Sequence, residues 1–118
     1  MAFWSPVESE DALKELIESS DSSAVFILKH SFRCALSSMA KSRIEKSKEE
    51  RLRYYLIDVV QNRAVSNALA EIFSVSHESP QAFLIKDSKL IEVKSHLAIK
   101  PHGFSVLLDS FADQSANL

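Results

Sequence analysis

The sequence of 118 residues contains one cysteine, one glycine and no long apolar run. Because there is no second thiol, no disulfide can form within the chain, and an unpaired cysteine suits the reducing cytosol better than an oxidising exterior. We therefore expect a cytoplasmic location. Gly103 alone cannot build the glycine-rich loops of dinucleotide-binding or Walker motifs, in which the backbone closes on a phosphate. These nucleotide-binding classes are excluded.

The charge balance and the apolar segments exclude two further kinds of partner. Fourteen lysines and arginines against sixteen acidic residues give a net charge of −2, which offers no electrostatic attraction to nucleic acid or to an anionic membrane. No apolar run approaches the roughly 18 residues of a membrane-spanning helix, and the first residues lack the basic and apolar regions of a signal peptide. We expect no nucleic acid and no membrane as partners.

The composition predicts one folded unit. Hydrophobic residues make up 46% of the chain and charged residues 25%, which is typical of a globular domain. A domain of this length buries about two-thirds of the surface that its unfolded chain exposes, so its core needs no disulfide or metal. We expect a single domain over residues 1–118, with a frayed tail from Asp113.

The first half of the chain predicts helices alternating with strands. Apolar residues recur at helical spacing over residues 8–20, with Ser9 ahead of two acidic residues. The continuous apolar run 24–28 indicates a strand buried on both faces, and a second helical pattern begins at Cys34. Aromatic and β-branched residues over 54–60 indicate another strand. A strand, a crossover helix and a strand of this type form a right-handed parallel pair.

The second half predicts one more helix, a hairpin and a closing helix. Asn62 can cap the helix that follows the second strand. Segments 82–86 and 90–94 form an antiparallel hairpin, although the turn at 87–88 has no glycine to define its geometry. Pro101 suits the first turn of the last helix. The predicted fold is therefore α/β, with a central mixed four-stranded sheet and flanking helices in the order αβαβαββα.

This arrangement resembles the thioredoxin-like fold, because a cysteine stands between the first strand and its crossover helix and a proline opens the hairpin. A closer likeness is to the YtxJ family of monothiol bacilliredoxins. The segments that carry it are 29–37 (KHSFRCALS), 77–81 (HESPQ) and 95–96 (SH). The resemblance extends from Trp4 to about Phe111. It implies a thiol-disulfide oxidoreductase that exchanges with bacillithiol, a low-molecular-weight thiol that serves as co-substrate, and that removes this thiol from S-thiolated client proteins. No other cofactor is implied.

The family resemblance and the chemistry of thiols both make Cys34 the candidate catalytic residue. A cysteine in the first turn of a helix meets unpaired N–H groups that favour the thiolate, and a thiol of low pKa leaves readily when a second thiol attacks. Ser37 stands where a dithiol protein has its resolving cysteine, and its hydroxyl can donate to the thiolate but cannot form a disulfide. Arg33 adds a permanent positive charge nearby, and His30 adds one only when it is protonated.

Two further positions follow from the resemblance. In the thioredoxin-like fold, the residue before the hairpin proline offers its backbone to a bound thiol or peptide through a cis bond, which makes Ser79 and Pro80 candidate substrate-binding residues. Where the family usually has proline, this chain has Ala35, whose N–H we expect to lower the thiol pKa further. The histidine spacing (30, 77, 96, 102) matches no zinc pattern, so we expect no metal site.

Alternative interpretations remain open for the site and for the function. Cys34 can instead be a small buried hydrophobe, and Ser37 an ordinary residue of a helical first turn. One alternative function is a redox-inert interaction module with a thioredoxin-like fold. Another is a glutathione-linked monothiol glutaredoxin with an iron–sulfur cluster, against which the near absence of glycine argues.

Overall fold

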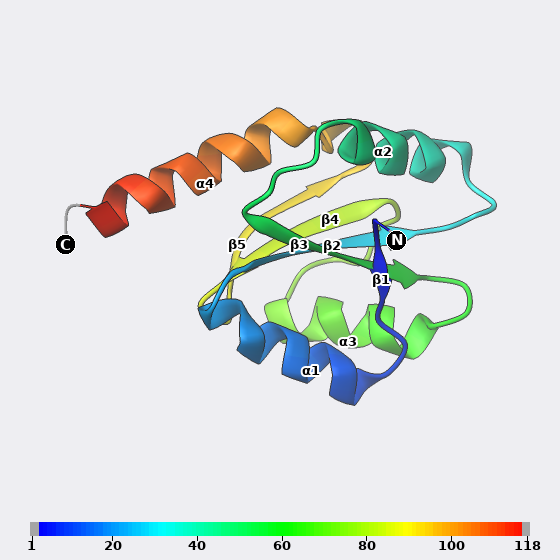
Figure 1. Cartoon of the computed structure of the whole chain (residues 1–118). Coiled ribbons are helices and arrows are strands. Elements are labelled where there is room, and N and C mark those ends of the chain that lie inside the picture. Colours follow the sequence, from blue (N-terminus) through cyan, green and yellow to red (C-terminus); the bar gives the residue numbers. More distant parts are fainter. Residues whose placement is uncertain (1–2, 117–118) are drawn as a thin grey trace.

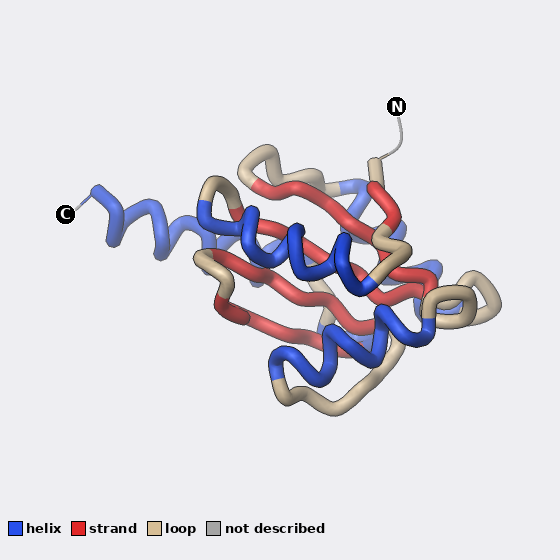
Figure 2. The backbone as a smooth tube through the Cα atoms, turned by 90° about the horizontal axis from the view of Figure 1, so that it is seen from below, coloured by secondary structure: helices blue, strands red, loops and turns tan. Residues whose placement is uncertain are grey.

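Helices cover both faces of a mixed five-stranded sheet. The computed structural model describes residues 3–116, and side chains as far as residue 110. Helices α1 and α3 lie on one face of the sheet and α2 and α4 on the other, with the C-terminal half of α4 extending beyond the sheet (Figures 1 and 2). The elements are α1 (Glu10–Glu18), α2 (Ala35–Lys46), α3 (Arg63–Phe73) and α4 (Pro101–Ala116), with short 3₁₀ turns η1 (Ser19–Asp21) and η2 (His96–Ala98).

The strands confirm the predicted α/β class and correct the predicted strand number. Their order in the sheet is β1-β3-β2-β4-β5, with β2 parallel to β3 and antiparallel to β4. The extra strand, β1, has two residues, one of them proline, and pairs with the outer edge of β3. Such a short segment carries no alternating pattern, so the sequence could not reveal it. The strands are β1 (Ser5–Pro6), β2 (Ala24–His30), β3 (Leu52–Asp58), β4 (Gln81–Lys86) and β5 (Lys89–Ser95).

Most helix ends lie where the sequence places them. Ser9 caps α1, its hydroxyl accepting a hydrogen bond from the Ala12 N–H, and Cys34 is the N-cap residue of α2. Asn62 takes the cap position of α3, but its side chain makes no capping hydrogen bond, so that part of the prediction is wrong. Helix α4 continues to Ala116, past the point from which we expected fraying; residues 117 and 118 lie outside the described part of the chain.

Side chains of the central strand β2 alternate between two apolar clusters. Phe26 and Leu28 pack with residues of α2 and α4, whereas Val25 and Ile27 pack with residues of α1 and α3. This alternation follows from the two-residue period of a strand. The same period continues through the end of β2, so residue 30 faces the α2 side and residue 29 faces the α1 and α3 side. Both are fully buried.

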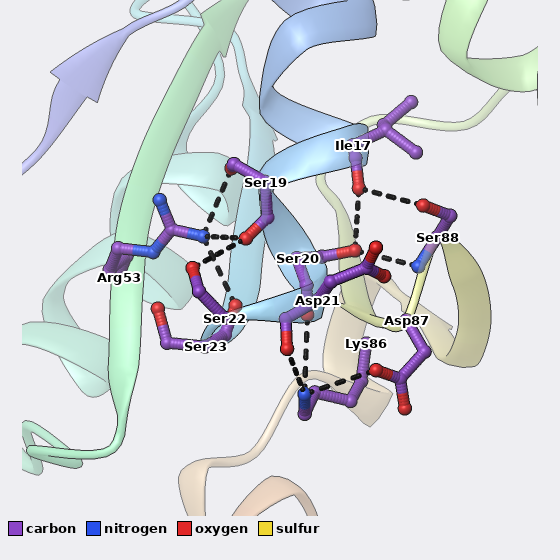
Figure 3. Close-up of polar contacts among 10 residues, drawn as sticks. All are labelled: Ile17, Ser19, Ser20, Asp21, Ser22, Ser23, Arg53, Lys86, Asp87 and Ser88. Carbon is purple, nitrogen blue, oxygen red and sulfur yellow. Dashed lines mark hydrogen bonds and ion pairs between the residues drawn. The ribbon is translucent and has the colours of Figure 1, made fainter.

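The glycine-free hairpin turn is held by contacts outside the hairpin. Asp87 and Ser88 adopt positive φ values of 55° and 61°, as the central residues of a type I′ turn do. Ser20, in the 3₁₀ turn η1, accepts hydrogen bonds from both turn N–H groups, at 3.1 Å to its carbonyl and 2.8 Å to its hydroxyl (Figure 3). These contacts with Ser20 therefore hold the two turn residues at positive φ, a conformation that glycine would otherwise adopt most easily.

Candidate functional site

Cys34 lies at the carboxyl end of the central strand, at the junction between β2 and α2. Its N–H donates to the Ser31 carbonyl at 3.1 Å, which closes a turn after the strand, and its own carbonyl accepts from the Ser38 N–H at 3.1 Å. The side chain is partly exposed and unpaired with another thiol. Cys34 therefore occupies the position in which a helix presents its unpaired N–H groups to the cap side chain.

The start of α2 stabilises the thiolate. The backbone N–H of Ser37 contributes most to lowering the pKa of Cys34, and the Ser37 hydroxyl comes next. Desolvation raises this pKa, and the N–H of Leu36 lowers it by a smaller amount. Ser37 is fully buried, and its Oγ has no hydrogen-bond partner of ordinary geometry among the described residues. The hydroxyl is therefore available to the sulfur.

The groups that lower the pKa of Cys34 belong to the second and third helical residues, Leu36 and Ser37. These are the residues whose N–H groups a capping side chain ordinarily meets, although the Cys34 side chain makes no capping hydrogen bond. Ala35, the first residue, is not among the groups that lower the pKa of Cys34. The structure thus gives no support to our expectation that its N–H lowers the thiol pKa.

His30 lies beneath α2, on the same side of the sheet as Ser37. Burial lowers the pKa of His30 most, and Lys41 lowers it further, against opposing effects of the Ser37 backbone carbonyl, Asp58 and Glu45. The side chain is 1% exposed, and its Nδ1 has no hydrogen-bond partner within the described part of the chain. His30 is therefore neutral near pH 7, and the positive charge that we considered for it is confined to acidic conditions.

Arg33 points outward from the same loop. It is exposed, and it lines a hollow of about 430 Å³ together with Phe32, Asp58, Val60 and Gln61. Its guanidinium is not among the groups that set the pKa of Cys34. The position of Arg33 thus favours contact with a bound molecule over contact with the sulfur.

Ser79 and Pro80 reach the same end of the sheet from β4. The Ser79–Pro80 peptide bond is cis, as predicted. Because Gln81 pairs with Lys29 near the end of β2, the two residues before it lie beside the loop that carries Cys34. The Pro80 carbonyl also accepts the His96 N–H at 3.0 Å, which ties the segment to the end of β5. The structure therefore brings the cysteine loop and the proline segment together.

Sequence reasoning missed two buried polar residues at this end of the sheet. Lys29 is fully buried, and its amine lies 3.0 Å from Nδ1 of His77. Gln81 is also buried and bonds to the backbone of the segment before it. Strand β2 continues through Lys29, although the apolar run ends at Leu28. His96 is exposed.

A family model described as "Monothiol bacilliredoxin BrxC" matches residues 5–103. The chain belongs to this family. The match covers β1 through the start of α4 and so includes Cys34, Ser37 and the Ser79–Pro80 segment. It confirms the resemblance to monothiol bacilliredoxins and places the protein in an oxidoreductase family with a thioredoxin-like fold.

Solved structures confirm the fold of this bacilliredoxin. One described by its thioredoxin fold is 31% identical with a TM-score of 0.79, covering 86% of this chain and 90% of that chain. A thioredoxin from Trypanosoma brucei brucei gives 0.71 at 12% identity, covering 93% and 91% of the two chains. A mutant thioredoxin from Halobacterium salinarum gives 0.68 at 20% identity, covering 89% and 87%. Within residues 3–116, no helix is long and apolar enough to cross a lipid bilayer.

Proposed function

We propose that this bacilliredoxin removes a bacillithiol-type thiol from mixed disulfides on client proteins, through Cys34 alone. The observation that carries the proposal is the position of Ser37 relative to Cys34 at the start of α2. Ser37, not a second cysteine, stands three residues after Cys34 in the first turn of α2, and its N–H and hydroxyl lower the pKa of the thiol. Membership of the monothiol bacilliredoxin family supports the choice of thiol.

The first step exchanges one disulfide for another. The Cys34 thiolate attacks the sulfur of the small thiol, the bond between that sulfur and the client cysteine breaks, and the client leaves as a thiolate. The client is reduced and Cys34 is oxidised to a mixed disulfide, so no external oxidant or reductant takes part. The Ser37 N–H and hydroxyl favour the thiolate that starts this step.

The second step needs a thiol from outside the protein. Cys34 is the single cysteine of the sequence, and Ser37 cannot form a disulfide. A second small thiol, as thiolate, attacks the small-thiol sulfur of the adduct, and Cys34 leaves as a thiolate while the small thiol is released as its own disulfide. The low pKa of Cys34 makes it a good leaving group.

The remaining candidate residues act in binding. The exposed guanidinium of Arg33 is suited to a carboxylate of the small thiol or of the client, beside the hollow that it lines. The backbone of Ser79, next to Pro80, can pair with the bound chain on the other side of Cys34. His30 contributes a positive charge only where acid protonates it. Bacillithiol is the co-substrate, and S-thiolated proteins are the partners.

The mass of the protein isolated from its native cells tests the identity of the thiol. After rapid alkylation of free thiols, we expect a fraction of the intact protein to carry one adduct on Cys34 whose mass equals that of bacillithiol. Treatment with a reductant should remove the adduct. An adduct with the mass of glutathione would contradict the choice of thiol, and a Cys34 that is always free, even after oxidative stress, would favour the redox-inert alternative.

A further inference from the structure

Lys29 brings an amine into the apolar interior of the sheet. Its side chain is 0% exposed and lies on the α1 and α3 side, with the amine 5.5 Å from the centre of the Phe83 ring. The amine lies 3.0 Å from Nδ1 of His77, and the hydroxyl of Ser66 on α3 lies 3.3 Å from the same nitrogen. The buried amine thus reaches the segment that leads into β4.

Gln81 holds the same segment from the neighbouring strand. It pairs with Lys29 across the β2–β4 ladder, so the two side chains lie next to each other on one face. Its Nε2 donates to the Ser76 carbonyl at 3.0 Å, and its Oε1 accepts the Glu78 N–H at 3.3 Å. Two neighbouring buried side chains therefore hold residues 76–78, immediately before Ser79.

The amine of Lys29 is not explained by stability. Burial lowers the pKa of Lys29 to about 8, which means that the folded state disfavours the charged amine. A methionine would fill nearly the same space without this cost. A buried amine that lowers the stability of the fold is better explained by a role in function.

We propose that Lys29 is a positioning residue for substrate docking: through His77 it fixes the 76–80 segment, and with it the Ser79 backbone, beside Cys34. The inference rests on the proposed function, because it takes Ser79 as a docking position for the thiol or the client peptide. Lys29 does not touch the sulfur, and the groups that set the thiolate lie on α2.

The contact depends on the charge of His77. Its Nδ1 accepts a hydrogen bond from the Lys29 ammonium only while that nitrogen is unprotonated. Burial, Lys29 and Arg63 lower the pKa of His77, Glu78 raises it, and Ser66 is the remaining polar side chain against the ring. Protonation in acid removes the acceptor and brings two cations together. Docking should therefore weaken as the pH falls through the lowered pKa of His77.

Rates of thiol transfer from a peptide that carries a bacillithiol mixed disulfide, measured against peptide concentration, test the proposal. We expect Lys29→Met and His77→Ala to raise the half-saturating concentration about tenfold, as the loss of one hydrogen bond to a charged group does. The maximal rate should stay within about twofold, since the Cys34 environment is intact. The double variant should be no worse than either single one, because both break the same contact.

His77→Asn is the conservative variant. The asparagine amide can place its oxygen where Nδ1 lies, and it does not titrate. Near pH 7, His77→Asn should have the half-saturating concentration of the wild type. In acid, its docking should not weaken as that of the wild type does. A His77→Asn protein that saturates like His77→Ala at neutral pH would contradict a role for the acceptor.

Lys86→Met is the matched control at the far end of β4. The Lys86 amine donates to the Ser20 and Asp21 carbonyls, at 3.4 and 2.9 Å, and lies 3.2 Å from an Asp87 carboxylate oxygen (Figure 3). Loss of the Lys86 amine should lower the free energy of unfolding and leave the half-saturating peptide concentration unchanged. The proposal would be overturned if Lys29→Met kept the half-saturating concentration of the wild type. It would also be overturned if Lys86→Met raised this concentration as much as Lys29→Met does.

Amide signals of residues 76–79 give a second measurement that does not depend on the reaction. In NMR spectra of the labelled protein they should shift, and exchange with solvent faster, in Lys29→Met but not in Lys86→Met. Unchanged signals would show that Lys29 does not hold the segment. If the wild-type protein accepts no thiol from the peptide, the proposed function fails, and the amide signals still decide whether Lys29 positions this segment.

Discussion

Ser37, the third residue of α2, lies three residues after the N-cap residue Cys34, and its backbone N–H and hydroxyl are the groups that most lower the pKa of the Cys34 thiol. The cysteine is the N-cap residue of α2, and although its side chain makes no capping hydrogen bond, the sulfur lies at the helix end where the unpaired N–H groups favour a thiolate. A serine hydroxyl occupies the place that a resolving cysteine would need. The same residue, Ser37, therefore stabilises the thiolate and, because it is not a cysteine, cannot resolve a mixed disulfide on Cys34.

Ser37→Ala should raise the pKa of Cys34 only in part. The substitution removes the hydroxyl but keeps the backbone N–H, which is the larger of the two contributions. The rate of alkylation by iodoacetamide, measured against pH, should show a transition at higher pH than in the wild type but still below that of an unfolded control peptide. A transition equal to that of the peptide would show that the helix N–H groups do not act on the sulfur.

Ala35→Pro should leave the pKa of Cys34 nearly unchanged. Proline at the first helical position loses an N–H that is not among the groups lowering the pKa of Cys34, and its fixed φ suits this position. Titration of thiolate absorbance gives the comparison directly. A clear rise in the thiol pKa would restore the expectation, drawn from the sequence, that the Ala35 N–H contributes.

Lys29→Met should stabilise the protein near pH 7, by roughly 1 to 3 kcal/mol, because it removes a buried charge. The pKa of Lys29 falls from 10.5 in the unfolded chain to about 8 in the fold. Between these values the unfolded state binds more protons, so wild-type stability should rise as the pH increases from about 8 to about 10.5. Urea unfolding at several pH values should show this rise in the wild type and in Lys86→Met, but a smaller one in Lys29→Met. Parallel pH profiles for all three proteins would contradict the lowered pKa.

The sequence predicted the elements that carry strong local patterns. The apolar run of β2, the cap at Ser9, the start of α2 at Cys34 and the β4–β5 hairpin are all found. The cis bond before Pro80 was predicted from the family resemblance, since only about 5% of X–Pro bonds in folded proteins are cis.

The end of β2 could not be predicted. Lysine and histidine are rarely buried, so a local pattern ends the strand at Leu28, whereas pairing with β3 continues to His30. The charge state of His30 and the contact between Lys29 and His77 depend on burial between distant segments. Both are properties of the tertiary structure, and no spacing in the sequence carries them.

The most direct test of the monothiol mechanism is the stoichiometry of transfer from a protein that carries a bacillithiol mixed disulfide. Mass spectrometry of both proteins should show one thiol moving to Cys34 per molecule, after which the reaction stops until a small thiol is added. Cys34→Ser should take up none, and Ser37→Ala should react more slowly and to the same extent. Repeated turnover without added thiol, or removal of the adduct by Cys34→Ser, would contradict the account.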